Sequence, residues 1–341
     1  MSDDLSGPGI VFLEVETWEE DFLKRLCPPA WNARYYTEEA DRIDLVKIAD
    51  AEIVSAFIYS NLDARVLSQL PALRMIATRS TGVDHINMAT CRERNIAVSN
   101  VPTYGTNTVA EHTFALLLSL SRKIYQARER TLHNNFSFHG LQGFDLKEKV
   151  LGVIGTGRIG QHAIRIARGF EMHVLAYDPH QDAAASERLG FDYVGLDELL
   201  ARSDVISLHC PLTPETQHMI GKSAFQQMKS GVTLINTARG GLIDTAALLW
   251  ALDAGIVAAA GLDVLEEEEA VREERELLSG CFDGAKLQAV LRNNVLANDE
   301  RVIITPHIAF NSREAVERIL HTTVDNIAAY LATTPINVVD K

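Results

Sequence analysis

The feature that most constrains this chain is a buried-strand pattern followed at once by a glycine-rich turn and a helical pattern. Residues 150–154 are apolar or glycine, residues 155–160 have the spacing GxGxxG, and a helical run extends over 161–170. The first glycine permits a tight turn, the second lets a pyrophosphate approach the backbone, and the third lets the helix pack closely on the strand. Strand, turn and helix in this order predict a dinucleotide-binding βαβ unit, with the anion at the helix N-terminus.

The nucleotide specified by this unit is predicted from Asp178, which ends a second strand pattern 18 residues after Gly160. A carboxylate there accepts hydrogen bonds from ribose hydroxyls and repels a 2′-phosphate, so we expect NAD rather than NADP. Ligands of open α/β sheets also contact the carboxyl ends of later strands. The predicted cofactor-binding residues are Gly155, Thr156, Gly157, Arg158, Ile159, Gly160, Asp178, Cys210, Pro211, Thr216, Thr237, Ala238 and Asp263. Cys210 could also be a nucleophile, but nothing in its sequence surroundings indicates a lowered pKa, so a packed residue is favoured.

Short apolar or β-branched runs alternate with helical patterns along the whole chain. The predicted strands are 9–15, 53–58, 75–78, 150–154, 173–177, 205–209, 232–236, 258–263 and 302–304. Strands that alternate with helices build parallel sheets with helices on both faces, so the fold class is α/β. A chain of 341 residues exceeds the usual size of one domain, and two domains are expected.

Two prolines suggest where these domains divide. The residue before Pro102 is pushed out of the helical region, and Asn107 and Thr108 are then expected to cap a long helix that reaches about Arg130. Pro306 breaks the last strand before a helix over about 313–331. We therefore predict an NAD-binding Rossmann domain over 103–305, inserted into a substrate domain formed by 1–102 and 306–341.

Composition limits the partners and the compartment. The formal net charge of −14 disfavours nucleic acid and anionic membranes as partners. The four cysteines lack paired spacing, which is typical of reduced thiols, and the chain starts without the pattern of a secretory signal. The most apolar stretch, 114–120, is far shorter than a membrane span. These observations predict a cytoplasmic protein.

Polar residues suited to one reaction follow three of the later strands. Arg239 follows 232–236, four glutamates (266–269) follow 258–263, and His307 follows 302–304. A guanidinium binds a carboxylate bidentately, an imidazole donates a proton to a ketone oxygen, and a carboxylate paired with that imidazole orients it and raises its pKa. Each residue alone could be an ordinary solvated loop residue, but together with the nucleotide motif they predict reduction of a 2-keto acid. No metal is expected, and the histidines without metal-ligand spacing are interpreted as structural or surface residues: His112, His133, His139 and His218.

Several segments, in order, resemble the D-isomer-specific 2-hydroxyacid dehydrogenase family. They are 79–84, 101–104, 109–112, 155–160, 209–213, 235–241, 261–264 and 305–309. The resemblance covers most of the chain and implies two Rossmann-like, doubly wound parallel-sheet domains with the active site in the cleft between them. It also implies a homodimer joined through the nucleotide domains.

The resemblance assigns roles to individual residues. It implies that Arg239 binds the substrate carboxylate, that Glu268 orients the histidine, that His307 is the general acid/base, and that Asp263 contacts the nicotinamide side. Counted from Asp263, the family's spacing selects Glu268 from the glutamate run. A solvated helix start is the alternative interpretation of the run, and it is open for Glu266, Glu267 and Glu269. The implied substrate-binding residues are Ser80, Thr81, Gly82 and Val83, in a loop whose amides hold the carboxylate, and Tyr104.

The expected activity is therefore NAD-dependent reduction of pyruvate or a related small 2-keto acid, and the long segment after Glu268 resembles the D-lactate dehydrogenase branch. Two alternatives stay open: a phosphoglycerate- or hydroxypyruvate-type dehydrogenase, and an NAD-sensing protein similar to the corepressors that share this fold. The absence of basic arms disfavours the second. The side chain of the substrate, the D stereochemistry (implied by the resemblance alone) and the physiological direction are not determined by the residues.

Overall fold

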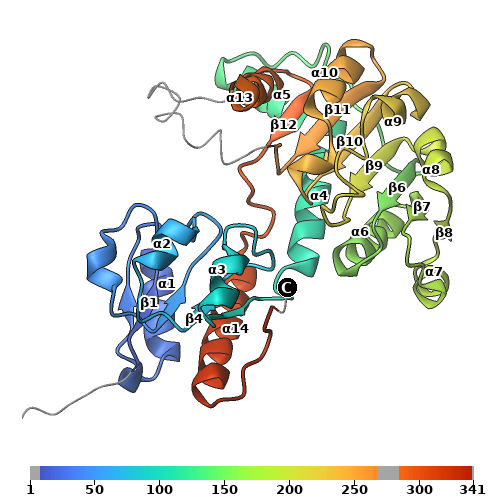
Figure 1. The fold of residues 1–341 in the computed structure, drawn as a ribbon. Helices are drawn as coiled ribbons and strands as arrows, with labels where there is room; N and C mark the ends of the chain where they lie inside the picture. Colours follow the sequence, from blue (N-terminus) through green and yellow to red (C-terminus); the bar gives the residue numbers. More distant parts are fainter. Residues whose placement is uncertain (1–7, 267–283, 340–341) are drawn as a thin grey trace, which may run out of the picture. The chain divides into compact units, whose positions relative to one another are not determined.

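The computed structural model describes residues 8–266 and 284–339 (Figure 1). The chain divides into two compact units: Met1–Tyr104 with Ser312–Lys341, called the smaller unit below, and Gly105–Asn311, called the larger unit. The sequence places the corresponding boundaries at 102/103 and 305/306. Each unit contains one sheet in which all neighbouring strands run parallel, so the predicted class of two Rossmann-like α/β domains is confirmed.

The sheet of the smaller unit has the strand order β2-β1-β3-β4-β5. Successive residues of a strand point to opposite faces of the sheet. On one face, Val11, Val54 and Ile76 pack with α2 and α3. Helix α14 contacts strand β4 and helix α1. Its elements are β1 (Ile10–Phe12), α1 (Thr17–Leu26), η1 (Pro29–Trp31), β2 (Arg34–Tyr35), η2 (Leu45–Ile48), β3 (Ile53–Ser55), α2 (Ala64–Ser68), β4 (Met75–Ala77), α3 (Met88–Glu93), β5 (Ala97–Ser99) and α14 (Arg313–Leu331).

The sheet of the larger unit has the order β12-β11-β10-β9-β6-β7-β8. The strand order reverses between β6 and β9, and ligands of such sheets bind outside the carboxyl ends of the strands at this point. The elements are α4 (Thr106–Ser121), α5 (Ile124–Leu132), β6 (Val150–Ile154), α6 (Arg158–Gly169), β7 (His173–Tyr177), α7 (Ala183–Leu189), β8 (Asp192–Tyr193), α8 (Leu196–Arg202), β9 (Val205–Leu208), α9 (Lys222–Gln227), β10 (Val232–Asn236), η3 (Gly240–Leu242), α10 (Thr245–Asp253), β11 (Val257–Leu262), α13 (Gly284–Ala297) and β12 (Val302–Ile304).

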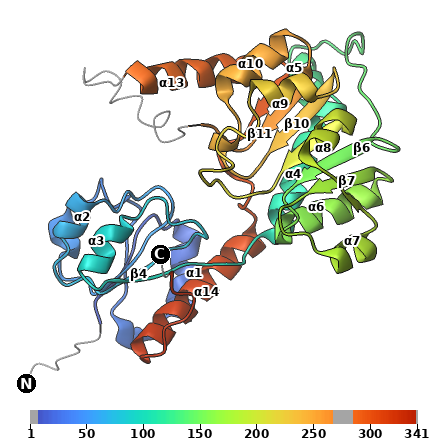
Figure 2. The same ribbon diagram turned by 45° about the vertical axis from the view of Figure 1, so that its right-hand side comes forward.

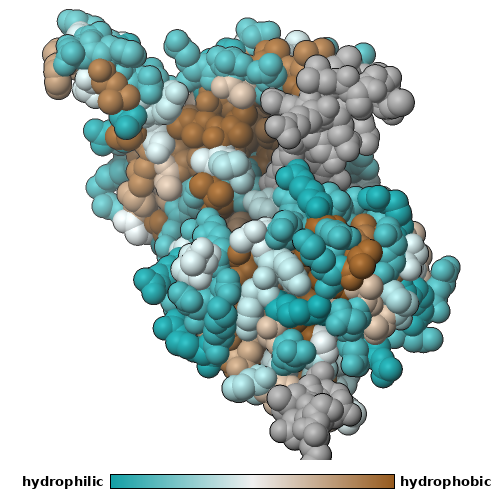
Figure 3. All heavy atoms as spheres, turned by 90° about the vertical axis from the view of Figure 1, so that its left-hand side faces the viewer, coloured by the Kyte–Doolittle hydropathy of each residue, from teal (hydrophilic) through white to brown (hydrophobic). Residues whose placement is uncertain are grey.

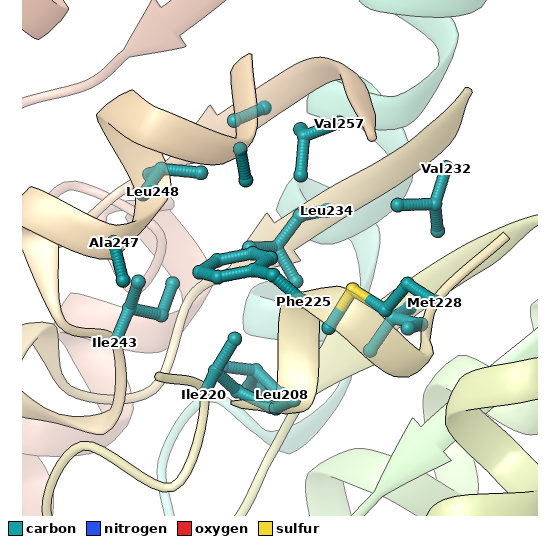
Figure 4. Close-up of a cluster of buried hydrophobic side chains, with 14 of the residues drawn as sticks. Leu208, Ile220, Phe225, Met228, Val232, Leu234, Ile243, Ala247, Leu248 and Val257 are labelled. Atoms are coloured by element: carbon teal, nitrogen blue, oxygen red, sulfur yellow. The ribbon is translucent and has the colours of Figure 1, made fainter. Parts of the chain in front are cut away.

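Helices cover both faces of this larger sheet (Figure 2). The cluster on one face joins α4, α6 and α7 to the strands, and the cluster on the other joins α8, α9, α10 and α13. Figure 4 shows the second cluster, in which the ring of Phe225 lies among Leu234, Leu248 and Ile220. These four side chains are at most 1% exposed, so the sheet is a rigid base for the loops at its edges.

The predicted long helix from Asn107 to about Arg130 is wrong in two respects. Helix α4 is preceded by Gly105 as its N-cap, and Asn107 lies inside the first turn, where its side chain donates to Glu111 (3.0 Å) rather than capping. The helix also ends at Ser121, and α5 begins after Lys123, whose φ is 50°. The reason is a long-range contact: the amide of Phe144 donates to the carbonyl of Ser121 (3.0 Å), a carbonyl that a continuous helix would use for its next turn.

The surface is mixed in character. On the face drawn in Figure 3, apolar side chains gather in patches within a largely polar surface. Single exposed apolar side chains are normal for a folded protein. In the part of the chain that the structure describes, no helix is both long and apolar enough to cross a membrane.

Candidate active site

The glycine turn after β6 is tight where it packs and open where a pyrophosphate would approach. Gly155 has a φ of 96°, and a Cβ there would lie 2.7 Å from the amide nitrogen of Cys210. A Cβ on Gly160 would lie 2.0 Å from the carbonyl oxygen of Gly155. Gly157 differs, because a Cβ there would meet nothing within 4 Å. These residues fit a dinucleotide, whose phosphates need bare backbone at the start of α6.

Asp178 directly follows β7 and is hydrogen-bonded to the glycine turn. One carboxylate oxygen accepts from the amide of Thr156 (2.7 Å) and from its hydroxyl (3.1 Å), and the other accepts from the amide of His180 (2.8 Å). The Thr156 hydroxyl also contacts the hydroxyl of Tyr193 (2.8 Å). The structure thus brings Asp178 and the turn together, as binding of one nucleotide requires.

The predicted cofactor residues after β9 and β10 lie at the same edge of the sheet. The Thr216 hydroxyl donates to the carbonyl of Pro211 (2.8 Å), and Thr237 contacts Thr113 on α4 through their hydroxyls (2.9 Å). Burial raises the pKa of Cys210 to about 11. The thiol therefore stays protonated near neutral pH, which argues against a nucleophile.

Arg239 sits at the turn that follows β10. Asn236, fully buried at the end of the strand, donates from its side-chain amide to the carbonyl of Arg239 (2.9 Å) and accepts from the amide of Ala238 (3.0 Å). The half-buried guanidinium donates from Nη1 to the carbonyl of Ala238 (2.8 Å). Asn236 therefore shapes the turn that carries the predicted carboxylate-binding arginine.

His307 follows β12 in a left-handed backbone conformation, with a φ of 55°. Its amide donates to the carbonyl of Asp263 (2.9 Å), and the amides of Ile308 and Ala309 donate to the carboxylate of Asp263 (2.9 and 2.8 Å). A left-handed conformation is unfavourable for a residue with a Cβ and persists only where neighbouring contacts impose it. Asp263 supplies those contacts.

Asp263 itself is 1% exposed and stays ionised. Burial alone would raise its pKa, but hydrogen bonds from His112, Thr305 and the amides of Ala309 and Ile308 lower the pKa below its usual value. The Thr305 hydroxyl donates to Asp263 (2.5 Å), so it accepts from Nε2 of His112 (3.0 Å). His112, interpreted from sequence as structural or surface, is thus part of the support of His307.

Glu268, the predicted orienting acid, lies outside the described residues. The first glutamate of the run, Glu266, is described, and the alternative of a solvated side chain does not hold for it. Its side chain is only 21% exposed, and its oxygens contact Nε2 of His218 (2.5 Å) and the hydroxyl of Thr245 (2.8 Å). The start of α10 and the loop after β9 supply these partners, and neither is close to Glu266 in the sequence.

In the smaller unit, the predicted substrate loop follows β4. The Ser80 hydroxyl donates to the carbonyl of Gly82 (2.6 Å), and the Thr81 hydroxyl donates to the carbonyl of Val101 (2.7 Å). Among the described residues, the amides of Thr81, Gly82 and Val83 donate to no protein acceptor. Three unused amides in one turn suit a carboxylate.

Two further positions complete the smaller unit. Arg79, directly before the loop in sequence, is 2% exposed and donates from Nη2 to the carbonyls of Leu13 (2.7 Å) and Glu14 (2.8 Å). Tyr104 is the last residue of the first segment of the smaller unit, and its carbonyl accepts from Arg318 on α14 (2.6 Å). Within the residues that the structure describes, no group of three or more histidine, cysteine, aspartate or glutamate side chains could hold a metal ion.

The residues that the sequence analysis missed are mostly anchors rather than reacting groups. Asn236, Thr305, His112 and Glu266 each hold a loop that carries a predicted functional residue. A polar residue at the end of a buried strand is a usable signal for Asn236, which directly precedes the loop of Arg239. The pairings of His112 and Glu266 join segments far apart in sequence, so no local signal marks them.

The comparisons with known proteins agree with this geometry. Residues 114–309 match the family model described as the NAD-binding domain of D-isomer-specific 2-hydroxyacid dehydrogenases. The chain is 40% identical over 282 residues to the D-lactate dehydrogenase of Escherichia coli, covering 81% of this chain and 82% of that protein. It resembles the structure of D-lactate dehydrogenase from Aquifex aeolicus complexed with NAD and lactic acid (TM-score 0.81, 37% identity, 96% of each chain). It also resembles a pyruvate reductase of Chlamydomonas reinhardtii (TM-score 0.88, 36% identity, 97% of this chain and 98% of that one).

Proposed function

This chain belongs to the D-isomer-specific 2-hydroxyacid dehydrogenase family, and from that premise we propose that it reduces pyruvate or a related small 2-keto acid to the D-2-hydroxy acid. It is an NAD-dependent oxidoreductase of the D-lactate dehydrogenase branch. One observation carries the proposal: loops after β10 and β12 present Arg239 and His307 at the carboxyl edge of the sheet that bears the dinucleotide turn. NADH, when bound, supplies the hydride.

Arg239 has the chemistry to fix the substrate. A guanidinium pairs with a carboxylate through two parallel hydrogen bonds, which orients the neighbouring keto carbon. The unused amides of Thr81, Gly82 and Val83 supply further donors of the kind that a carboxylate accepts. We assign these residues to the substrate carboxylate and Tyr104 to the substrate side chain.

His307 is the proton donor of the proposed reaction. The carbonyl oxygen gains negative charge as the hydride arrives, and a protonated imidazole neutralises that charge by donating its proton. In the direction of oxidation the neutral imidazole takes the proton from the hydroxyl. Glu268 is proposed to pair with the ring and favour its charged form, while the contacts of Asp263 hold the backbone on which the ring is carried.

We also propose that the protein is a cytoplasmic homodimer joined through the larger unit. The segment 124–138 supports this, because no residue of α5 is buried and several of its apolar side chains are more than half exposed. Phe136 and Phe138 are 79% and 78% exposed, and Ile124, Tyr125 and Leu132 are 55%, 58% and 56% exposed. Such a concentration is typical of a protein contact. The described cysteines are all free thiols, as in a reducing compartment: Cys27, Cys91 and Cys210.

The test is NADH oxidation by purified protein with pyruvate, phenylpyruvate, 2-ketoisocaproate, glyoxylate and hydroxypyruvate, followed by chiral analysis of the product. We expect fast turnover of one or two acids, formation of the D isomer, and loss of turnover in Arg239→Ala with NADH binding kept. Preference for hydroxypyruvate would favour the hydroxypyruvate-type alternative. Tight NADH binding without turnover of any acid would contradict the proposal and favour an NAD sensor.

A further inference from the structure

Glu266 contacts the loop after β9, the first turn of α10 and helix α13. Its carboxylate contacts Nε2 of His218, in the loop after β9, at 2.5 Å. The other oxygen accepts from the hydroxyl of Thr245 (2.8 Å) and from its amide (3.3 Å), at the first turn of α10. The carbonyl of Glu266 accepts from the side-chain amide of the buried Asn293 on α13 (2.9 Å). One residue therefore joins the segment after β11 to elements on three sides.

The same segment packs directly on the turn that carries Arg239. A Cβ on Gly240 would lie 1.9 Å from the carbonyl oxygen of Leu265 and 2.5 Å from the amide nitrogen of Glu266. Only glycine permits this backbone contact. A shift of the Glu266 segment would therefore displace Gly240, the residue next to Arg239. The loop after β9 is joined to the same turn, since the amide of His218 donates to the carbonyl of Gly241 (2.8 Å).

From these contacts we propose that Glu266 is a positioning residue of the keto-acid reduction. It fixes the Arg239 turn against the segment after β11. The inference rests on the proposed function. It gives Glu266 a part in the reaction without contact with substrate or cofactor, and it explains why a carboxylate in this acidic run is held by two side chains rather than left in solvent.

The geometry distinguishes this role from the two other roles open to a glutamate there. A solvated residue would not have its oxygens engaged by His218 and Thr245. An acid that orients His307 would need its oxygens for that ring. A positioning residue acts through Arg239, and its loss displaces the substrate while the nucleotide turn 155–160 and Asp178 are left as they are.

The test compares Glu266→Ala, Glu266→Gln and Thr245→Val with Glu187→Ala, an exposed residue of α7 that matches the first variant in its change of charge. Rates are expressed per NADH-binding site, so that unfolded protein does not count. For Glu266→Ala we expect kcat/KM for the keto acid to fall by about 100-fold, the effect of a small misplacement of reacting groups. NADH affinity should stay within about threefold, because its main contacts lie elsewhere.

The other variants show whether the contacts themselves matter. Glu266→Gln keeps an acceptor for Thr245 and should recover most of the activity, while Thr245→Val should lose roughly 10-fold through one hydrogen bond to a charged group. If Glu266→Ala does not fold, Thr245→Val decides the question. If the wild type is active and Glu266→Ala or Thr245→Val has the same kcat/KM per NADH-binding site as Glu187→Ala, this inference is overturned and the proposed function is not. A wild type without turnover of any 2-keto acid overturns the proposed function, and the inference with it.

Discussion

Each unit contains one buried charged side chain close to a predicted functional loop, but the two charges are opposite and only one of them contacts its loop. In the smaller unit, Arg79 directly precedes the loop 80–83 but donates to the carbonyls of Leu13 and Glu14, which lie in another segment. In the larger unit, Asp263 lies beneath the His307 loop and accepts from the amides of Ile308 and Ala309. Both are at most 2% exposed.

The two loops also differ in the groups that they can offer a substrate. Arg79 uses its donors on the segment of Leu13 and Glu14, and among the described residues the amides of the loop 81–83 donate to no protein acceptor, so they can bind an anion. An anion consumes amides, so the loop above Asp263 offers the side chain of His307 rather than its backbone. Asp263 thus fixes the His307 loop directly, whereas Arg79 fixes a segment next to the loop 80–83.

Removing the cation should have the larger effect on stability. In Arg79→Met, the buried carbonyls of Leu13 and Glu14 lose their donors, and the free energy of unfolding should fall by roughly 3–5 kcal/mol. Urea unfolding followed by circular dichroism measures this. Arg65→Met is the matched control, since that side chain is 70% exposed, and it should change stability by about 0.5 kcal/mol or less. Equal losses in the two variants would contradict the anchoring role.

Asp263→Asn should have a smaller effect that depends on pH. The carboxamide keeps the size of the side chain but not its charge, so about 2–3 kcal/mol should be lost near neutral pH. Hydrogen bonds lower the pKa of Asp263 in the folded protein. Its stabilising contribution is therefore present above the ordinary pKa of 3.8 and disappears as the pH falls through the lower folded-state pKa. A difference between wild type and variant that does not shrink in acid would count against an ionised Asp263.

His85 adds a buried group of the smaller unit that stays neutral. Burial lowers the pKa of His85 to about 4, against the opposing charge of Asp84. The unfolded chain takes up a proton near pH 6.5 and the folded one does not, so stability should fall between pH 6.5 and 4, by about 3 kcal/mol. His85→Gln should flatten this dependence, and the exposed His133→Gln should not. The same slope in all three proteins would rule His85 out as its source.

Cys210 lies at the same edge of the sheet as Asp263, but its substitution should have the smallest effect. Burial raises the pKa of Cys210 to about 11, so its thiol is not a nucleophile at neutral pH. Cys210→Ser should change kcat/KM by less than about threefold, an effect of packing alone. A loss of 100-fold or more in steady-state assays would show that the thiol takes part in the reaction.

The sequence predicts the five-residue strands and the edge strand β12, and it misses the two-residue strands. Strands β6, β7, β10 and β12 have the predicted bounds, because runs of mostly apolar or β-branched residues in a buried sheet leave a clear pattern. Strands β2 and β8 have two residues each, too few for any periodicity. The predicted strand 9–15 ends at Phe12, because Glu14 adopts a φ of 53° and its carboxylate accepts from the amides of Phe57 and Tyr59.

The site is divided in the same way. Arg239, His307 and the glycine turn are predicted from residue type, spacing and resemblance, since each closely follows a strand. The anchors are not: Glu266 meets His218 across 48 positions, and His112 meets Thr305 across 193. Such partners are set by how the loops pack at the sheet edge, which no local pattern records.

The most direct test of the account is a single-turnover experiment with enzyme, NADH and the preferred 2-keto acid, comparing wild type with His307→Gln. The account predicts that NADH binding is kept and that the rate of NADH oxidation falls by roughly 10²–10⁴-fold, the contribution of a general acid. An unchanged rate in His307→Gln would contradict the assignment of His307 as proton donor, and with it the mechanism proposed for the chain.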